Sequence, residues 1–151
     1  MIIRDAETKD IDRMLLLLKQ LGYEQNKSTF VENFKFFTAK DGYHIFVAEI
    51  DMKAAGMIAI STSHYIVAKK IRIEIEALVV DEQYRRQGIA SALVKHVEDY
   101  AKSNTPAVIQ LVSNVNRSSA HEFYRSLGYK NEGKNEKLYL RKDIDKSNQP
   151  Y

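Results

Sequence analysis

Apolar residues along the chain follow two spacings, one typical of helices and one typical of strands. Thr8 is a candidate N-cap, and Asp10 and Asp12 suit the positive end of a helix that follows it. This helix buries one face, which consists of Ile11, Met14, Leu15, Leu18 and Leu21. Gly22 then takes the place of a C-terminal cap. Ser28 precedes a second helical stripe, formed by Phe30, Val31, Phe34 and Phe37.

The strand-like segments predict a sheet within residues 1–80, about the first half of the chain. Ile2–Arg4 is a short strand, and Tyr43–Ile50 and Ala54–Ser61 form a hairpin around a tight turn. A loop, His64–Lys70, leads to a strand over Ile71–Val80. In that strand the alternation of isoleucine with charged residues gives way to a wholly apolar run, which indicates entry into the core through a bulge.

The last third predicts helices separated by strands. Gly88 opens a helix whose buried face is Ile89, Leu93, Val97 and Ala101, and a strand over Ala107–Val112 follows Pro106. A further helix presents Ala120, Phe123, Tyr124 and Leu127 on one side and stops at Gly128. Lys137–Arg141 is predicted to close the sheet as a final strand. The fold class is therefore α/β (α+β).

Composition narrows the class of protein. A chain of 151 residues with 44% hydrophobic residues is expected to form a single domain over residues 1–144, followed by a polar tail over 145–151. The absence of cysteine excludes disulfides and thiolate metal sites. No apolar run approaches the ~20 residues of a membrane span, so we expect a cytoplasmic protein without membrane association. A net charge of +3 suits a phosphate-bearing ligand better than nucleic acid.

The most informative segment runs from Leu78 to Ser91. A buried strand leads through a turn containing Arg85 and Arg86 directly into a helix with small residues at Gly88 and Ala90. A helix start offers backbone N–H groups without internal partners, together with the positive end of the macrodipole, and therefore binds phosphates. Neither a Gly-Lys-Ser/Thr nor a Gly-x-Gly-x-x-Gly pattern is present, so a P-loop or a dinucleotide fingerprint is excluded. The alternative is that the arginines form only a solvated face.

Two segments together resemble a known family. Arg85-x-x-Gly88-x-Ala90, after the strand ending Leu78-Val79-Val80, is similar to the acyl-CoA pyrophosphate motif of GNAT N-acetyltransferases. The segment Ala120–Tyr129 resembles their later helix, in the right order. The resemblance implies a mixed, mostly antiparallel sheet of six to seven strands flanked by about four helices, in which two splayed parallel strands form the cofactor wedge.

The resemblance also implies a cosubstrate, acetyl-CoA, and no metal. Backbone groups of Leu78 and Val80 are expected to pair with the pantetheine arm, and the amides from Arg86 to Ser91 to wrap the diphosphate. The residues expected to bind the cofactor are Leu78, Val79, Val80, Arg85, Arg86, Gln87, Gly88, Ile89, Ala90, Ser91, Arg117 and Tyr124. Arg117 departs from the family pattern, which commonly has Asn there, so Arg117 is expected to contact either the cofactor or the solvent.

Catalysis needs a base because an alkylammonium acceptor with a pKa of about 10.4 is mostly protonated at neutral pH. Glu76 is the expected base, and Glu74, one strand period away, is the reserve. A backbone N–H near Val79 or Val80 would stabilise the oxyanion. Tyr124 resembles the family's general acid, which protonates the departing thiolate. Each assignment has a purely structural alternative. Glu76 could be only an exposed carboxylate on a strand, and Tyr124 could be only a tyrosine packed in the core.

The expected function is therefore N-acetyl transfer from acetyl-CoA to a primary amine by direct attack in a ternary complex. Two other functions compete with it: a non-catalytic acyl-CoA sensor or interaction module of the same fold, and a small basic nucleic-acid binder. The acceptor stays open among polyamines, aminoglycosides, amino acids and protein amines. Acceptor specificity is expected in the first two helices and the His64–Lys70 loop. A homodimer is also left open.

Overall fold

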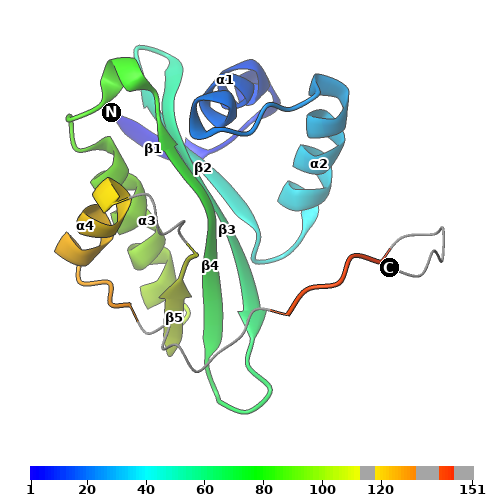
Figure 1. Cartoon of the computed structure of the whole chain (residues 1–151), viewed down its shortest axis with the longest axis vertical. Coiled ribbons are helices and arrows are strands. Elements are labelled where there is room, and N and C mark those ends of the chain that lie inside the picture. Colours follow the sequence, from blue (N-terminus) through cyan, green and yellow to red (C-terminus); the bar gives the residue numbers. More distant parts are fainter. Residues whose placement is uncertain (113–117, 132–139, 145–151) are drawn as a thin grey trace. The chain divides into compact units, whose positions relative to one another are not determined.

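In the computed structural model, five strands of the described residues form one sheet in the order β1-β2-β3-β4-β5 (Figure 1). They are β1 (Ile2–Asp5), β2 (His44–Ile50), β3 (Lys53–His64), β4 (Ile71–Val80) and β5 (Ala107–Gln110). Neighbours from β1 to β4 pair antiparallel, whereas β4 and β5 are parallel. The structure describes residues 1–112, 118–131 and 140–144. It divides into two compact units, 1–112 and 113–151, and each is described by itself.

The helices of the first unit cover both faces of this sheet. They are the 3₁₀ turn η1 (Thr8–Asp10), α1 (Ile11–Leu21), α2 (Lys27–Ala39), the 3₁₀ turn η2 (Glu82–Tyr84) and α3 (Ile89–Lys102). Helices α1 and α2 lie on one face and α3 lies on the other (Figure 1). The second unit contains α4 (Ser118–Ser126), which ends before Gly128 in the left-handed conformation at φ +92°.

Strand register decides which side chains meet which helix. Met57 lies opposite Val79 in the ladder, and both belong to the apolar cluster that α1 and α2 cover. Gly56, the residue before Met57 on β3, faces Ile89 and Leu93 of α3. A Cβ at Gly56 would come within 3.1 Å of Ile89 Cγ2, so the absence of a side chain lets α3 pack closely on the sheet.

The start of α1 differs from the prediction. Thr8 begins the 3₁₀ turn and does not cap the helix; Asp10 precedes α1, and its carboxylate accepts a hydrogen bond from the backbone N–H of Glu7 at 2.8 Å. Asp10 is 4% exposed and also pairs with Arg4, on β1, at 2.8 Å. The buried carboxylate therefore serves two donors at once, a demand that sequence spacing does not reveal.

Most of the other predicted elements form as expected. Gly22 ends α1 at φ +109°, and Phe30 and Phe34 are buried on α2. The predicted face of α3 is buried along its whole length. In the β2–β3 turn, Asp51 and Met52 adopt positive φ angles of 49° and 63°, the combination required by a tight hairpin.

The strand count was wrong for the residues that the structure describes, which form five strands rather than six to seven. Strand β5 ends at Gln110, before the predicted Val112, because its pairing with β4 ends there. The predicted strand Lys137–Arg141 falls largely outside the described residues, and its last two residues are not in a strand. The tail over 145–151 lies outside the described residues.

Candidate active site

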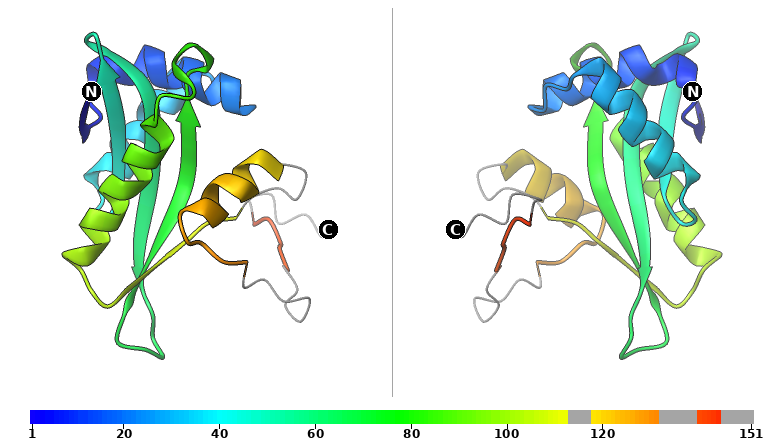
Figure 2. Two further views of the ribbon diagram at one scale, coloured as in Figure 1. Left: turned by 90° about the vertical axis from the view of Figure 1, so that its left-hand side faces the viewer. Right: turned by 90° about the vertical axis from the view of Figure 1, so that its right-hand side faces the viewer.

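Only the first part of β4 pairs with β5 along the edge that faces it. The parallel ladder joins Ile71–Glu74 to Ala107–Gln110 and then stops, whereas β4 continues to Val80. In Figure 2 the two strands diverge from the hairpin end of the sheet. Among the described residues, no strand pairs with this edge from Ile75 to Val80. The predicted splay of the two parallel strands is therefore present, and it leaves backbone groups of Leu78 and Val80 beside the opening.

The turn between β4 and α3 presents its backbone to solvent. Arg86 and Gly88 both adopt left-handed conformations, with φ of 64° and 76°, and α3 then begins at Ile89 without a capping side chain. A Cβ at Gly88 would meet nothing within 4 Å. The first N–H groups of a helix have no internal partners, so the amides that begin α3 remain available to an anion.

Cationic side chains flank these amides. Arg85, Arg86 and Gln87 are exposed, and within the described part of the chain neither arginine forms a salt bridge. Arg85 Nε lies 3.4 Å from the carbonyl oxygen of Val80. An uncapped helix start, uncompensated arginines and an open strand edge fit the diphosphate and the amide-rich arm of a coenzyme A thioester.

A buried network fixes the beginning of this turn. The carboxylate of Asp81, 3% exposed, pairs with Arg13 of α1 at 2.6 Å and accepts the N–H of Gln83 at 3.0 Å. Gln20 contacts the same carboxylate at 3.4 Å and accepts the N–H of Glu82 at 3.0 Å. Helix α1 therefore anchors the segment that leads into the turn between β4 and α3.

The same network reaches a bulge in β3. The pairing of β2 with β3 steps from Gly56 to Ala54, which leaves Ala55 as an extra residue. The carbonyl of Ala55 accepts the N–H of Asp81 at 2.8 Å, and that of Ala54 accepts Arg13 Nε at 3.0 Å. Burial acts to raise the pKa of Asp81, but hydrogen bonds from Gln83 and Arg13 outweigh it and hold that pKa below its usual range. Sequence reasoning did not single out Asp81; its only signal was a carboxylate directly after a buried strand.

Glu76 occupies a bulge in the strand that borders the opening. The β3–β4 ladder steps from Ile60↔Ile75 to Ala59↔Ala77, so Glu76 is the extra residue. The predicted bulge is confirmed. Glu76 is exposed, and Ser61 Oγ donates to its Oε1 at 2.5 Å. Glu74 lies opposite Ser61 and accepts from Gln110 Nε2 at 2.7 Å. Among the described residues, Glu74 is held by β5, whereas Glu76 is held by a hydroxyl group alone.

Tyr124 belongs to the second unit. Its ring makes edge contacts with Phe123 and Tyr129, with centroid distances of 5.1 and 5.7 Å. Burial raises the pKa of Tyr124 to about 12, because a phenolate would lose its hydration. The hydroxyl group is therefore protonated at neutral pH and can donate. Arg117 lies outside the described residues.

Of the predicted site residues, the structure brings together Glu76, Leu78–Val80 and Arg85–Ser91 in the first unit.

The described residues thus form a mixed α/β fold, with a five-stranded sheet, four α-helices and a helix that starts without a capping side chain after the fourth strand. The family model described as Acetyltransferase (GNAT) family matches residues 11–129. The chain belongs to the GNAT acetyltransferase family.

Curated relatives agree with this assignment. An uncharacterized N-acetyltransferase of Archaeoglobus fulgidus is 28% identical over 135 residues, covering 83% of this chain and 90% of the relative. Aminoalkylphosphonate N-acetyltransferase of Salmonella typhimurium is 29% identical and covers 85% of this chain and 84% of the relative. An uncharacterized N-acetyltransferase of Methanocaldococcus jannaschii is 31% identical over 64% of this chain, and human N-acetyltransferase 8 is 31% identical over 66%. The chain spans less than half the length of these last two relatives, 43% and 44%.

Solved structures share the fold. A putative acetyltransferase from Agrobacterium tumefaciens superposes with a TM-score of 0.82 at 22% identity, over 94% of this chain and 100% of the other. A protein from Bacillus halodurans, described as a transcriptional regulator, gives a TM-score of 0.81 at 26% identity over 92% and 99%. The fold therefore extends over almost the whole chain.

The described residues show neither a membrane-spanning helix nor a metal-binding group. None of their helices combines the length and apolar character needed to cross a membrane. They also contain no group of three or more His, Asp or Glu side chains placed to hold a metal ion.

Proposed function

We propose that this chain transfers the acetyl group of acetyl-CoA to a primary amine, by direct attack in a ternary complex. The observation that carries the proposal is the uncapped start of α3 beside an unpaired strand edge, because the two together offer amides for a diphosphate and backbone groups for an extended arm. Relatives and structural neighbours whose names specify an amine, such as the aminoalkylphosphonate enzyme and an aminoglycoside 6′-N-acetyltransferase of Acinetobacter haemolyticus, support an amine acceptor.

The residues proposed to hold the cosubstrate are those of the β4 end and the turn. Leu78 and Val80 would pair with the pantetheine arm, Val79 or Val80 would supply the oxyanion N–H, and the amides from Arg86 to Ser91 would surround the diphosphate. Arg85 contributes charge, and Arg117 is a further candidate. When bound, acetyl-CoA supplies an activated acyl group with a thiolate leaving group.

Glu76 and Tyr124 carry the proposed proton transfers. Removing the proton from an alkylammonium at neutral pH costs roughly 4 to 5 kcal/mol, and Glu76, exposed at a bulge and oriented by Ser61, is the candidate base. The hydroxyl group of Tyr124, a half-buried residue, is the candidate acid. We propose that residues 1–144 act as one functional domain in the cytoplasm. This domain would act without nucleic acid, either as a monomer or as a homodimer.

The test is release of free thiol from acetyl-CoA across a panel of amines. Tyr124→Phe should lower kcat about 100-fold with little change in the affinity for acetyl-CoA, and Glu76→Gln should lower kcat/KM similarly. Tyr129→Phe is the matched control, because it removes a hydroxyl group from a ring that contacts Tyr124. Activity should rise with pH as the acceptor loses its proton, and Tyr124 should cause no decline below about pH 10, since its pKa is about 12.

The alternative is a non-catalytic acyl-CoA sensor of the same fold. Acetyl-CoA would then raise the melting temperature, yet no amine would release thiol. Failure of coenzyme A to bind at all, measured by calorimetry, would rule out both.

A further inference from the structure

A polar strip runs along one face of β4, from Glu76 towards the hairpin that joins β3 and β4. In the ladder Arg72 lies opposite Ser63 and Glu74 lies opposite Ser61. Cross-strand partners share a face of a sheet, and Ser61 also donates to Glu76. The side chains of Arg72, Glu74 and Glu76 therefore lie on the same face, with Glu76 exposed and the other two half-buried.

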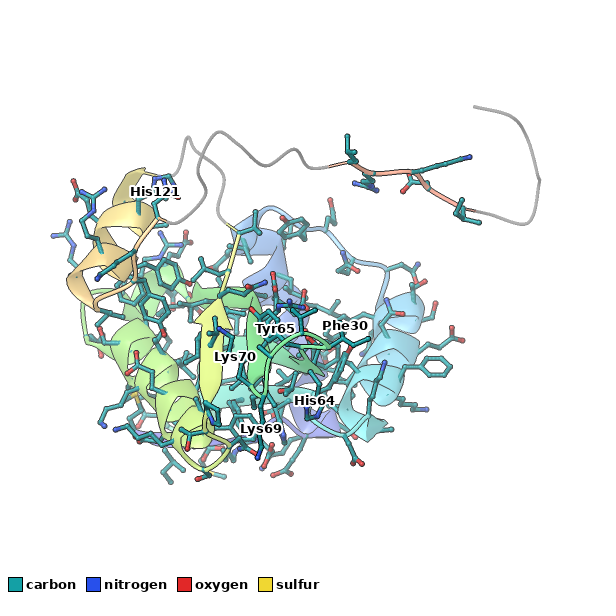
Figure 3. The ribbon with its side chains drawn as sticks, turned by 90° about the horizontal axis from the view of Figure 1, so that it is seen from below. Phe30, His64, Tyr65, Lys69, Lys70 and His121 are labelled. Carbon is teal, nitrogen blue, oxygen red and sulfur yellow. The ribbon has the colours of Figure 1, made fainter. Side chains whose placement is uncertain are left out.

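The hairpin end of this strip is positively charged and ordered. The guanidinium carbon of Arg72 lies 4.1 Å from the ring centroid of Tyr65, and Lys70 Nζ lies 5.0 Å from the same centroid. Arg72 also lies 3.4 Å from Ser63 Oγ. Figure 3 looks onto this end of the sheet and shows Tyr65 and Lys70 together, with Lys69 apart from them. Contact with the ring restricts both cations before any ligand arrives.

No carboxylate neutralises these cations in the part of the chain that the structure describes. Arg72 and Lys70 form no salt bridge there, and Glu74, two residues from Arg72 on the same face, instead accepts from Gln110. A planar guanidinium held against an aromatic ring keeps a donor fork suited to the two oxygens of a carboxylate or phosphonate.

We propose that the acceptor is a small primary amine that also carries an oxyanion, whether a carboxylate, a phosphonate or a phosphate. Arg72 binds the oxyanion, Lys70 adds positive charge beyond it, Tyr65 positions both cations, and the amine is left beside Glu76. A strand rises about 3.3 Å per residue, so the Cα atoms of Arg72 and Glu76 are roughly 13 Å apart. An aliphatic acceptor with a hydrogen bond of about 3 Å at each end can bridge this span. This inference rests on the proposed function and concerns the same site.

The experiment compares matched pairs of acceptors with the full-length protein. Butylamine is paired with 4-aminobutyrate, and propylamine with 3-aminopropylphosphonate, so that each pair differs chiefly in the oxyanion. The wild-type protein should show a kcat/KM about 10-fold or more higher for the anionic member, the factor that a charge-assisted hydrogen bond contributes. The carboxylate and phosphonate arms show which oxyanion fits better.

Substitutions at the cations locate the effect. Arg72→Gln should abolish the preference by raising KM for the anionic acceptor, while kcat/KM for the neutral amine and the affinity for acetyl-CoA stay unchanged. Arg72→Lys should restore part of the preference, since it keeps the charge but loses the fork. Lys69→Gln is the matched control, because Lys69 is exposed in the same loop and, among the described residues, does not contact the Tyr65 ring.

Two results would overturn the inference: neutral amines used as well as their anionic partners, or a preference that survives Arg72→Gln. If instead no amine in either set releases thiol, it is the proposed function that fails, and the two failures are thus distinguished. Melting temperatures measured for every variant separate loss of fold from loss of recognition.

Discussion

Asp81 joins three segments that lie far apart in the sequence: α1, the bulge in β3 and the turn that leads to α3. Asp81→Asn keeps the shape but removes the charge that faces Arg13, so we expect a loss of about 2 to 4 kcal/mol in the free energy of unfolding, measured in urea. The KM for acetyl-CoA should rise because the turn loses its anchor. Glu82→Gln, at an exposed neighbour, should change neither; equal effects at the two positions would contradict the anchoring role.

The network at Asp81 also shows which side-chain contacts cannot be predicted from the sequence. Arg85, Arg86 and Gly88 could be assigned to one turn because they are neighbours in the chain and the turn's chemistry depends on local backbone. Arg13 and Asp81 are 68 positions apart, and their pairing depends on how α1 packs on the sheet. Ser61, the partner of Glu76, was likewise not predicted, since it depends on strand register.

The start of α3 depends on a left-handed residue. Gly88→Ala introduces no steric contact, since nothing lies within 4 Å of the new Cβ, but it places a side chain at φ +76°. This conformation costs about 1 to 2 kcal/mol, which thermal unfolding would measure. If the turn binds the diphosphate, affinity for coenzyme A should also fall several-fold in calorimetry.

Gly22→Ala is the matched control for this helix start. It too has a positive φ, +109°, and open space around the new Cβ, but it ends α1. It should destabilise the protein by a similar amount and leave coenzyme A binding unchanged. A similar loss of binding in both variants would mean that stability, not the turn, governs affinity.

Strand pairing also divides into features that the sequence predicts and features that depend on the folded structure. The types of most elements follow from hydrophobic spacing, and the bulge in β4 was indicated by the change from alternating to continuous apolar residues. The sequence did not indicate the extent of the β4–β5 ladder, because β5 ends where β4 diverges from it and not where the apolar residues of β5 end.

The free energy of unfolding of the whole molecule should depend on pH in the acid range because of two buried carboxylates, Asp10 and Asp81. Burial acts to raise the pKa of Asp10 and of Asp81, but hydrogen bonds from Arg4 to Asp10, and from Gln83 and Arg13 to Asp81, hold each below the ordinary 3.8. A lowered pKa in the folded state stabilises the protein above that value, and this contribution is lost as pH falls through the folded pKa. We expect the free energy of unfolding to decline below about pH 4.

A double substitution tests this dependence. Asp10→Asn with Asp81→Asn should be less stable at pH 7 but show a flatter decline between pH 4 and pH 3, since two groups that take up protons on unfolding are gone. An unchanged slope in urea titrations at these pH values would show that other carboxylates govern acid unfolding.

The order of helices and strands, the turn before α3 and the family resemblance all follow from residues adjacent in the chain, since backbone propensity and hydrophobic spacing act over a few residues. The folded molecule adds what depends on distant partners: the bulge residue Glu76 held by Ser61, the anchor between Asp81 and Arg13, and the point at which β4 and β5 part. These features arise from strand register and helix packing, which bring together groups that no local pattern relates.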